Sequence, residues 1–137
     1  MANKLMMTTV ALVLLSASAL AEAQAARTWS TNGITGVHAQ GSTWTSNSWI
    51  NIKGYVKDTK CDGGAARVYF AFISSTLPGS TEREERVSTE GKPCGTVVPF
   101  HFRGYSGKYT EVLARECVSG LGLGRGCSMA ISIWKAP

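Results

Sequence analysis

The chain has 137 residues, which suits one domain with a hydrophobic core of its own. It holds 14 Lys and Arg against 9 Asp and Glu, which gives a formal net charge of +5. A moderately basic domain favours anionic partners, although the same charge can serve solubility alone. After residue 25 no segment is apolar and long enough to span a bilayer, so no transmembrane segment is expected there.

Residues 1–25 have the three-part layout of a secretory signal peptide. Lys4 gives a basic start, residues 5–20 are largely apolar, and sites of the Ala-x-Ala type follow as far as Ala25. An uncleaved membrane anchor is the alternative, but the apolar run is shorter than the roughly 20 residues that cross a bilayer. We therefore predict a signal peptide over residues 1–25. A single secreted domain follows over residues 26–137, extracellular or periplasmic.

All four cysteines lie in that predicted domain. An even number in a short exported chain points to disulfides rather than to metal binding. Cys117 and Cys127 flank a short loop, and Cys61 and Cys94 both lie in turns next to core strands. The preferred pairs are therefore Cys61–Cys94 and Cys117–Cys127, of three possible pairings. No Cys-x-x-Cys occurs, and the two histidines are isolated in the sequence, so no metal and no cofactor are expected.

Short alternating segments separated by turn residues follow along the chain. Residues 26–47 are polar and glycine-rich and predict one short or edge strand around residues 34–39. Further strands are expected at residues 48–57, 66–74, 82–87, 96–103, 109–118 and 128–134. The fold class predicted from this pattern is all-β, an antiparallel β-sandwich of about six to seven short strands stabilised by disulfides.

The composition of individual strands predicts where each lies. Residues 66–74 are apolar on one face and mostly apolar on the other, which indicates a central strand. Residues 82–87 are charged and suit an edge strand of a hairpin, and Pro99 places residues 96–103 at an edge or a bulge. Residues 110–116 have some helix propensity, but the neighbouring pattern favours a strand. In the last strand Met129, Ile131 and Ile133 are expected to face the core, with Trp134 on the opposite side.

The central turn carries a resemblance. Val56–Val68 reads Val-Lys-Asp-Thr-Lys-Cys-Asp-Gly-Gly-Ala-Ala-Arg-Val, and a cysteine-bounded segment follows late in the chain. This resembles small secreted actinobacterial all-β proteins of unassigned function, which are similar in a Val-x-Asp-Thr-x-x-Asp-Gly turn before a strand. The resemblance implies an exported all-β domain and supplies no catalytic residues.

Catalytic motifs are not evident. Asp58-x-Lys60-x-Asp62-Gly63 superficially resembles a calcium loop, but a lysine at the third position and the missing glutamate favour a simple turn. The adjacent Glu84 and Glu85 point to opposite faces of a strand, as do Glu111 and Glu116, and a solvated surface is the simpler reading of all four. The chain has no Gly-x-Ser-x-Gly elbow and no glycine-rich loop leading into a helix. We predict a non-enzyme and leave a small hydrolase open.

A binding face is the better functional candidate. Trp49, Lys53, Tyr55 and Lys57 alternate along one predicted strand, and Arg67 and Tyr69 along the next. If these strands pair, six side chains suited to stacking on sugars and holding acidic groups share one surface. This predicts a non-catalytic binding or structural protein of the cell envelope or extracellular space, with an anionic glycan or similar polymer as partner. Nucleic acid, which such surfaces also bind, is not expected outside the cell.

The loop at residues 118–126 supports the alternative function. It is bounded by cysteines and carries Leu121, Leu123 and Arg125, so it could act on another protein as an inhibitor or toxin-like element. Its alternating glycines argue against this reading, because a floppy loop loses entropy when it binds.

Overall fold

The computed structural model describes residues 25–31, 33–119 and 126–137. The predicted signal peptide therefore lies outside the described residues, apart from Ala25. The elements in chain order are strands β1 (Arg27–Thr31), β2 (Val37–Ser46), β3 (Trp49–Asp58), β4 (Ala65–Ser74), β5 (Thr81–Ser88) and β6 (Val97–Tyr105), the short 3₁₀ turn η1 (Ser106–Lys108), and strands β7 (Tyr109–Ser119), β8 (Gly126–Cys127) and β9 (Ile131–Lys135). Among the described residues, no helix has the length and apolar character that crossing a membrane requires.

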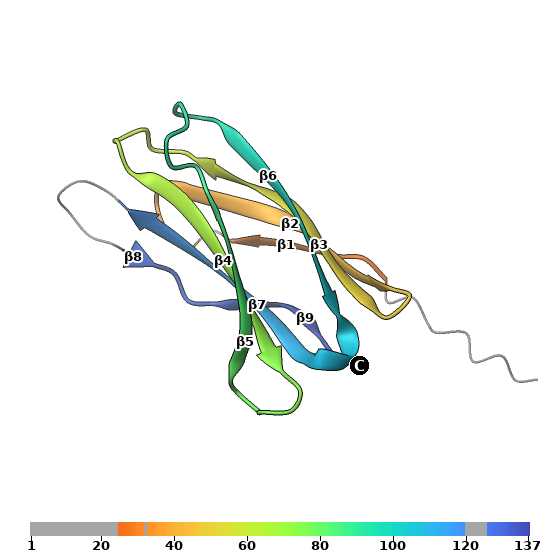
Figure 1. The fold of residues 1–137 in the computed structure, drawn as a ribbon. Helices are drawn as coiled ribbons and strands as arrows, with labels where there is room; N and C mark the ends of the chain where they lie inside the picture. The colour runs from red at the N-terminus through yellow and green to blue at the C-terminus, as the bar shows by residue number, and fades with distance from the viewer. Residues whose placement is uncertain (1–24, 32, 120–125) are drawn as a thin grey trace, which may run out of the picture.

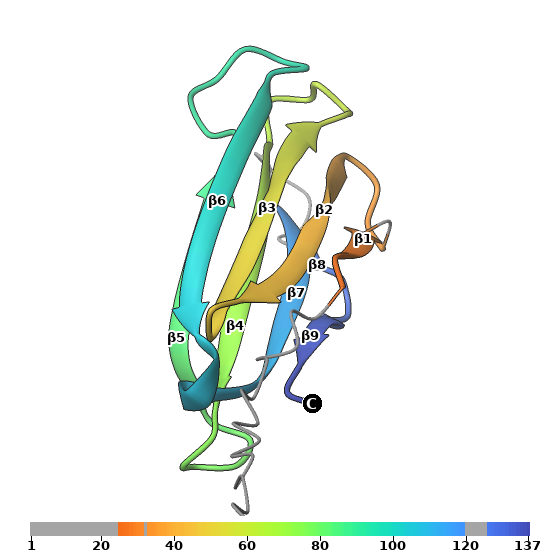
Figure 2. The same cartoon turned by 90° about the vertical axis from the view of Figure 1, so that its right-hand side faces the viewer.

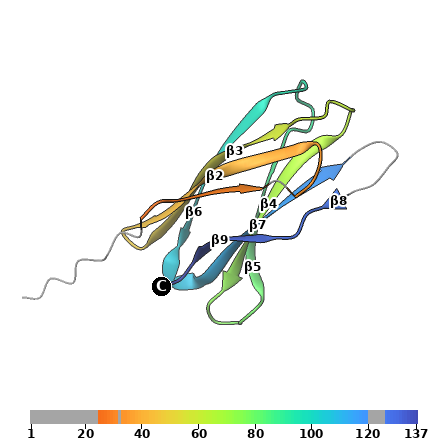
Figure 3. The ribbon, with the colours of Figure 1, turned by 180° about the vertical axis from the view of Figure 1, so that it is seen from behind.

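The strands form two antiparallel sheets that face each other (Figures 1 and 2). Sheet A has the order β1-β2-β3-β6, and sheet B has the order β5-β4-β7, with β8 and β9 both paired to the remaining edge of β7 (Figure 3). Phe70 of sheet B packs against both Trp29 and Phe100 of sheet A, at ring-centroid distances of 5.7 and 5.0 Å. The all-β, antiparallel, disulfide-stabilised sandwich predicted from the sequence is confirmed, with more strands than expected.

Several strand placements are also confirmed. β4 lies between β5 and β7, and β5 forms a free edge of sheet B. β6, which carries Pro99, is an edge of sheet A, where a residue without an N–H costs the ladder least. Residues 110–116 belong to β7 and are not helical. Both disulfides form as predicted, Cys61–Cys94 and Cys117–Cys127.

The polar segment at residues 26–47 holds two strands where one was expected. β1 and β2 form a hairpin, and their buried positions include Trp29, Ala39 and the two threonines Thr31 and Thr43. Small and hydroxylated residues fill these inward positions, so the alternation is present without the aliphatic side chains that usually reveal it.

A paired glycine row explains how β2 and β3 fit beneath large rings. Trp29, Gly41, Gly54 and Phe100 lie side by side across the four strands of sheet A. The rings of Trp29 and Phe100 stack at 6.1 Å with a 17° interplanar angle. A Cβ on Gly54 would lie 2.9 Å from the Phe100 ring. The absent side chains therefore make room for the aromatic layer.

The last strand corrects the sequence prediction. Met129 precedes β9 and is 90% exposed, so it takes no part in the core. Val112 pairs with Trp134 but the next residue, Leu113, pairs with Ser132, which leaves Ile133 as the extra residue of a β-bulge. Ile133 and Trp134 are consequently both buried.

Glu116 is the second correction, because the sequence placed it on a solvated surface. It lies on β7 opposite Val68 and is fully buried. Its Oε2 accepts a hydrogen bond of 2.5 Å from the Thr31 hydroxyl, and its Oε1 accepts one of 2.6 Å from the Ile34 N–H. The side chain faces inward with Val112 and Ala114 and fastens the β1–β2 segment of sheet A to sheet B.

Candidate binding surfaces

The β3 side chains singled out from the sequence share one side of the strand. Trp49 and Lys53 are exposed and Tyr55 and Lys57 are half-buried, while Ile50, Ile52 and Val56 between them are buried. Because side chains alternate along a strand, the first four all point away from the core. They form part of the outer face of sheet A.

Arg67 and Tyr69 do not join them. Their strand, β4, belongs to sheet B and does not pair with β3, so the condition under which the six residues form one surface is not met. Arg67 makes an ion pair with Glu90, and Arg115 lies over the Tyr69 ring at 5.6 Å. The six residues belong to two separate outer faces of the sandwich.

The neighbours of β3 complete the outer face of sheet A. β2 supplies His38 opposite Lys57 and Trp44 opposite Asn51. β6 supplies the residues opposite Lys53, Asn51 and Trp49, which are His101, Arg103 and Tyr105. Sequence reasoning missed these five residues because alternation gives the face of each strand but not which strands are neighbours. We define the aromatic-basic face as His38, Trp44, Trp49, Lys53, Tyr55, Lys57, His101, Arg103 and Tyr105.

One end of this face is a packed aromatic group. The rings of Trp49 and Tyr105 meet edge to face at 5.9 Å, and the Arg103 guanidinium lies 4.9 Å from the Trp49 ring centroid. Such cation–π contacts hold an arginine in place while leaving its charge available. Beside them, Trp44 and His101 stack at 6.3 Å, one from each neighbour of β3. Rings from three strands are thus fixed against one another before any ligand binds.

The other end combines cations with a shallow hollow. A hollow of about 570 Å³ lies over the glycine row, with Lys53, Tyr55, Gln40 and Ser42 among its lining residues. The His38 ring lies 6.1 Å from that of Tyr55. All outward positions of β1, β2, β3 and β6 lie within the described ranges, and none of them is Asp or Glu. Lys53, Lys57 and Arg103 therefore carry positive charge with no carboxylate on the same face.

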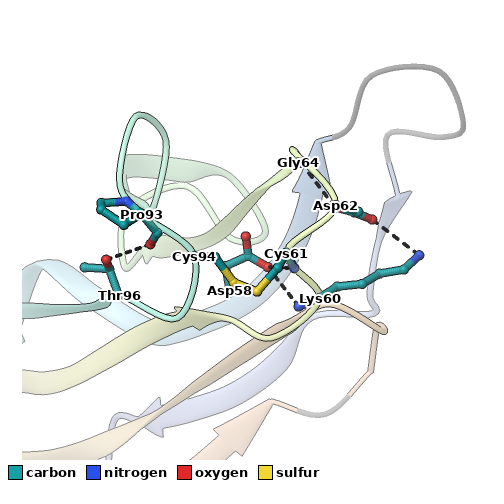
Figure 4. The surroundings of a disulfide bond; sticks show 8 residues. All are labelled: Asp58, Lys60, Cys61, Asp62, Gly64, Pro93, Cys94 and Thr96. Carbon is teal, nitrogen blue, oxygen red and sulfur yellow. Dashed lines mark hydrogen bonds and ion pairs between the residues drawn. A yellow bond between two sulfur atoms is a disulfide. The ribbon is translucent and has the colours of Figure 1, made fainter.

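The Asp58–Gly64 turn is held by its own carboxylates. Oδ1 of Asp58 accepts hydrogen bonds from the backbone N–H groups of Lys60 and Cys61, at 3.0 and 3.4 Å (Figure 4). Asp62 accepts one from Gly64 and forms an ion pair with Lys60. The Gly64 N–H, followed by Lys60, lowers the pKa of Asp62. Both carboxylates are thus used in turn formation, and the described residues contain no cluster of three or more candidate metal ligands.

The predicted inhibitory loop cannot be placed on either surface. Residues 120–125 lie outside the described residues, which leaves that function a prediction. No protein-family model matches the chain, and neither the curated proteins nor the solved structures contain a significant match.

Proposed function

We propose that this is an exported, non-catalytic binding protein whose aromatic-basic face holds an anionic glycan or a similar extracellular polymer. The observation that carries the proposal is the combination on one sheet of three cations and several preordered rings with no carboxylate. The predicted signal peptide and the two disulfides support a location outside the cytoplasm.

The chemistry of the face suits a chain of acidic sugars. The apolar faces of sugar rings stack on Trp and Tyr, and carboxylate or sulfate groups interact with Lys and Arg. Trp49 and Tyr55 are six residues apart on one strand, so their Cα atoms lie about 20 Å apart. That span accommodates several sugar units and no single small molecule, which favours a polymer lying along β3.

Binding of this kind depends on salt. The cations lie at the surface, where each contact with an acidic group contributes about 0.2–1 kcal/mol and is screened by added ions. We expect several such contacts, together with ring stacking, to give measurable retention at low ionic strength that falls as salt is raised.

The test is affinity electrophoresis of the mature domain through gels containing polygalacturonate, with neutral dextran as the reference polymer. Wild-type protein should be retarded by polygalacturonate only. Lys53→Gln combined with Arg103→Gln should weaken binding about 3- to 10-fold, because two surface contacts are removed. The matched control is Arg86→Gln combined with Arg115→Gln, which removes the same charge from sheet B.

The comparison of the two double variants tests whether the aromatic-basic face is the binding site. Full retention in the sheet B control with weakened retention in the sheet A variant supports the face. Equal weakening in both variants would show that retention depends only on the net charge of the protein. Equal retardation by dextran would show that retention does not depend on charge. Trp49→Ala provides a further check, since it should weaken binding without changing the protein's charge.

A further inference from the structure

A second hollow lies at one end of the sandwich, away from the aromatic-basic face. It has a volume of about 420 Å³ and lies between the loop after β3 and the loop after β5. The Cys61–Cys94 disulfide ties these two loops together (Figure 4). A volume of this size falls within the range of small-molecule sites. We call it the disulfide cleft.

Part of the disulfide cleft is lined by glycine backbone. Gly63, Gly64 and Gly91 contribute no side chains, and Gly63 and Gly91 have positive φ angles of 85° and 71°. A Cβ added to either would meet no atom within 4 Å, so the walls at these points are open. Exposed peptide groups of this kind suit a ligand that carries several hydroxyl groups.

Arg67 is one of the two cations that line the cleft. The side chain is 21% exposed, and Nη2 donates a hydrogen bond of 2.8 Å to Oε2 of Glu90. Nε is buried and has no hydrogen-bond partner among the described residues. An arginine has five N–H donors, and an unpaired buried donor costs about 1–3 kcal/mol. The guanidinium thus retains hydrogen-bonding capacity that its neighbours leave unused.

Further cations lie close to Arg67. Lys92 also lines the cleft. On the same outer side of sheet B, Arg86 and Arg115 lie directly opposite Tyr69 on the two neighbouring strands, one alternate position from Arg67. Neither makes an ion pair with a described residue. The cleft lining thus holds two cations, Arg67 and Lys92, and two carboxylates, Glu90 and Asp58. Asp58 accepts hydrogen bonds from the backbone N–H groups of Lys60 and Cys61, while Arg86 and Arg115 add positive charge on the adjoining sheet.

We infer that the disulfide cleft binds a small sugar-sized oxyanion, in which a carboxylate or phosphate accepts hydrogen bonds from Arg67 and the hydroxylated body lies against the glycine backbone. Arginine suits this role because its planar donor fork matches both groups. Glu90 competes with the ligand for the same guanidinium. The inference does not depend on the proposed polymer binding, because the residues involved lie outside sheet A's outer face.

The test is a two-dimensional NMR titration of the mature domain with D-glucuronate, with glucose 6-phosphate, and with neutral D-glucose. We expect saturable shifts at the amides of Gly63, Gly64 and Gly91 with one or both anionic sugars and none with glucose. The two anionic sugars show which oxyanion is preferred. Absence of shifts with either at 10 mM, a concentration about tenfold above a typical weak sugar affinity of 1 mM, would overturn the inference.

Three variants make the test specific. Arg67→Gln should weaken binding at least tenfold, and Glu90→Gln should tighten it about 3- to 10-fold, because the competing acceptor is removed. The Glu90→Gln gain does not arise from unfolding, so it guards against a destabilised Arg67→Gln protein. Lys53→Gln combined with Arg103→Gln should leave the titration unchanged. Unaltered affinity in both cleft variants, or equal loss in the sheet A variant, would refute the assignment.

Discussion

Replacing Glu116 tests whether a single buried carboxylate fastens the two sheets. Glu116→Leu keeps a side chain of similar volume but removes both acceptors. The Thr31 hydroxyl retains the Ala39 carbonyl, 3.1 Å away, as an alternative acceptor, whereas the described residues offer the Ile34 N–H no other acceptor. The main loss is therefore one orphaned backbone donor.

The hydrogen bonds of Glu116 set the size of the expected loss of stability. A buried donor without a partner costs about 1–3 kcal/mol, so we expect Glu116→Leu to lower the free energy of unfolding by about 1–3 kcal/mol. Glu116→Gln behaves differently. Its amide oxygen can accept from Ile34, and its amide nitrogen can donate to Thr31, whose own hydrogen then goes to Ala39. We expect this variant to lose about 1 kcal/mol or less.

Urea unfolding followed by tryptophan fluorescence, with the disulfides intact, measures both changes. Hydrogen exchange of the Ile34 amide gives a local readout, which should be slow in the wild type and in Glu116→Gln and fast in Glu116→Leu. A Glu116→Leu protein within 0.5 kcal/mol of the wild type, taking 0.5 kcal/mol as the ordinary range of surface substitutions, would refute the reasoning. So would equal costs for the two variants.

Three further outcomes follow from the packing and the turns. Gly54→Ala should lower the free energy of unfolding, measured by urea, by about 1–3 kcal/mol, because its Cβ would lie 2.1 Å from a carbonyl oxygen of the neighbouring strand. Ile133→Ala should cost about 2–4 kcal/mol in the same assay, whereas Met129→Ala should change stability by less than about 0.5 kcal/mol. The pKa of Asp62, lowered chiefly by the Gly64 N–H, should appear below 3.8 in an NMR titration of its carboxyl carbon. The stabilising contribution of this group is thus present above pH 3.8 and is lost as pH falls through the folded pKa; a midpoint at or above 3.8 would contradict the turn geometry.

Most of the fold prediction came from the alternation of apolar and polar residues along the strands. The segments around Ile52, Phe70 and Phe100 place large apolar residues at every second position, so their strands and inward faces could be read directly. Where the inward residues are glycine, threonine or alanine, as in β1 and β2, the same alternation gave too weak a signal. The burial of Trp134 beside Ile133 depends on a bulge against β7, which is a tertiary feature that no local pattern encodes.

For the candidate site, the sequence could not predict which strands are neighbours. The turn between β3 and β4 was compatible with a hairpin, which would have put Arg67 and Tyr69 beside Tyr55. In the structure the chain instead crosses to the other sheet, and β3 pairs with β6, whose residues lie at least 40 positions further along than their partners. Which strands become neighbours depends on long-range packing, so the partners Trp44, His101 and Arg103 could be found only from the fold.

The Cys61–Cys94 bond also determines whether the fragments separate after a protease cuts this molecule. The turn between β4 and β5 carries Leu77, which is 67% exposed, and offers the kind of surface segment at which nicking concentrates. A single cut there would separate the two cysteines into different fragments, yet the bond would keep the fragments covalently attached. The nicked protein would migrate as one species on a non-reducing gel and as two after reduction. Cleavage at this exposed turn would thus yield a two-chain protein and leave the disulfide-linked end of the sandwich intact.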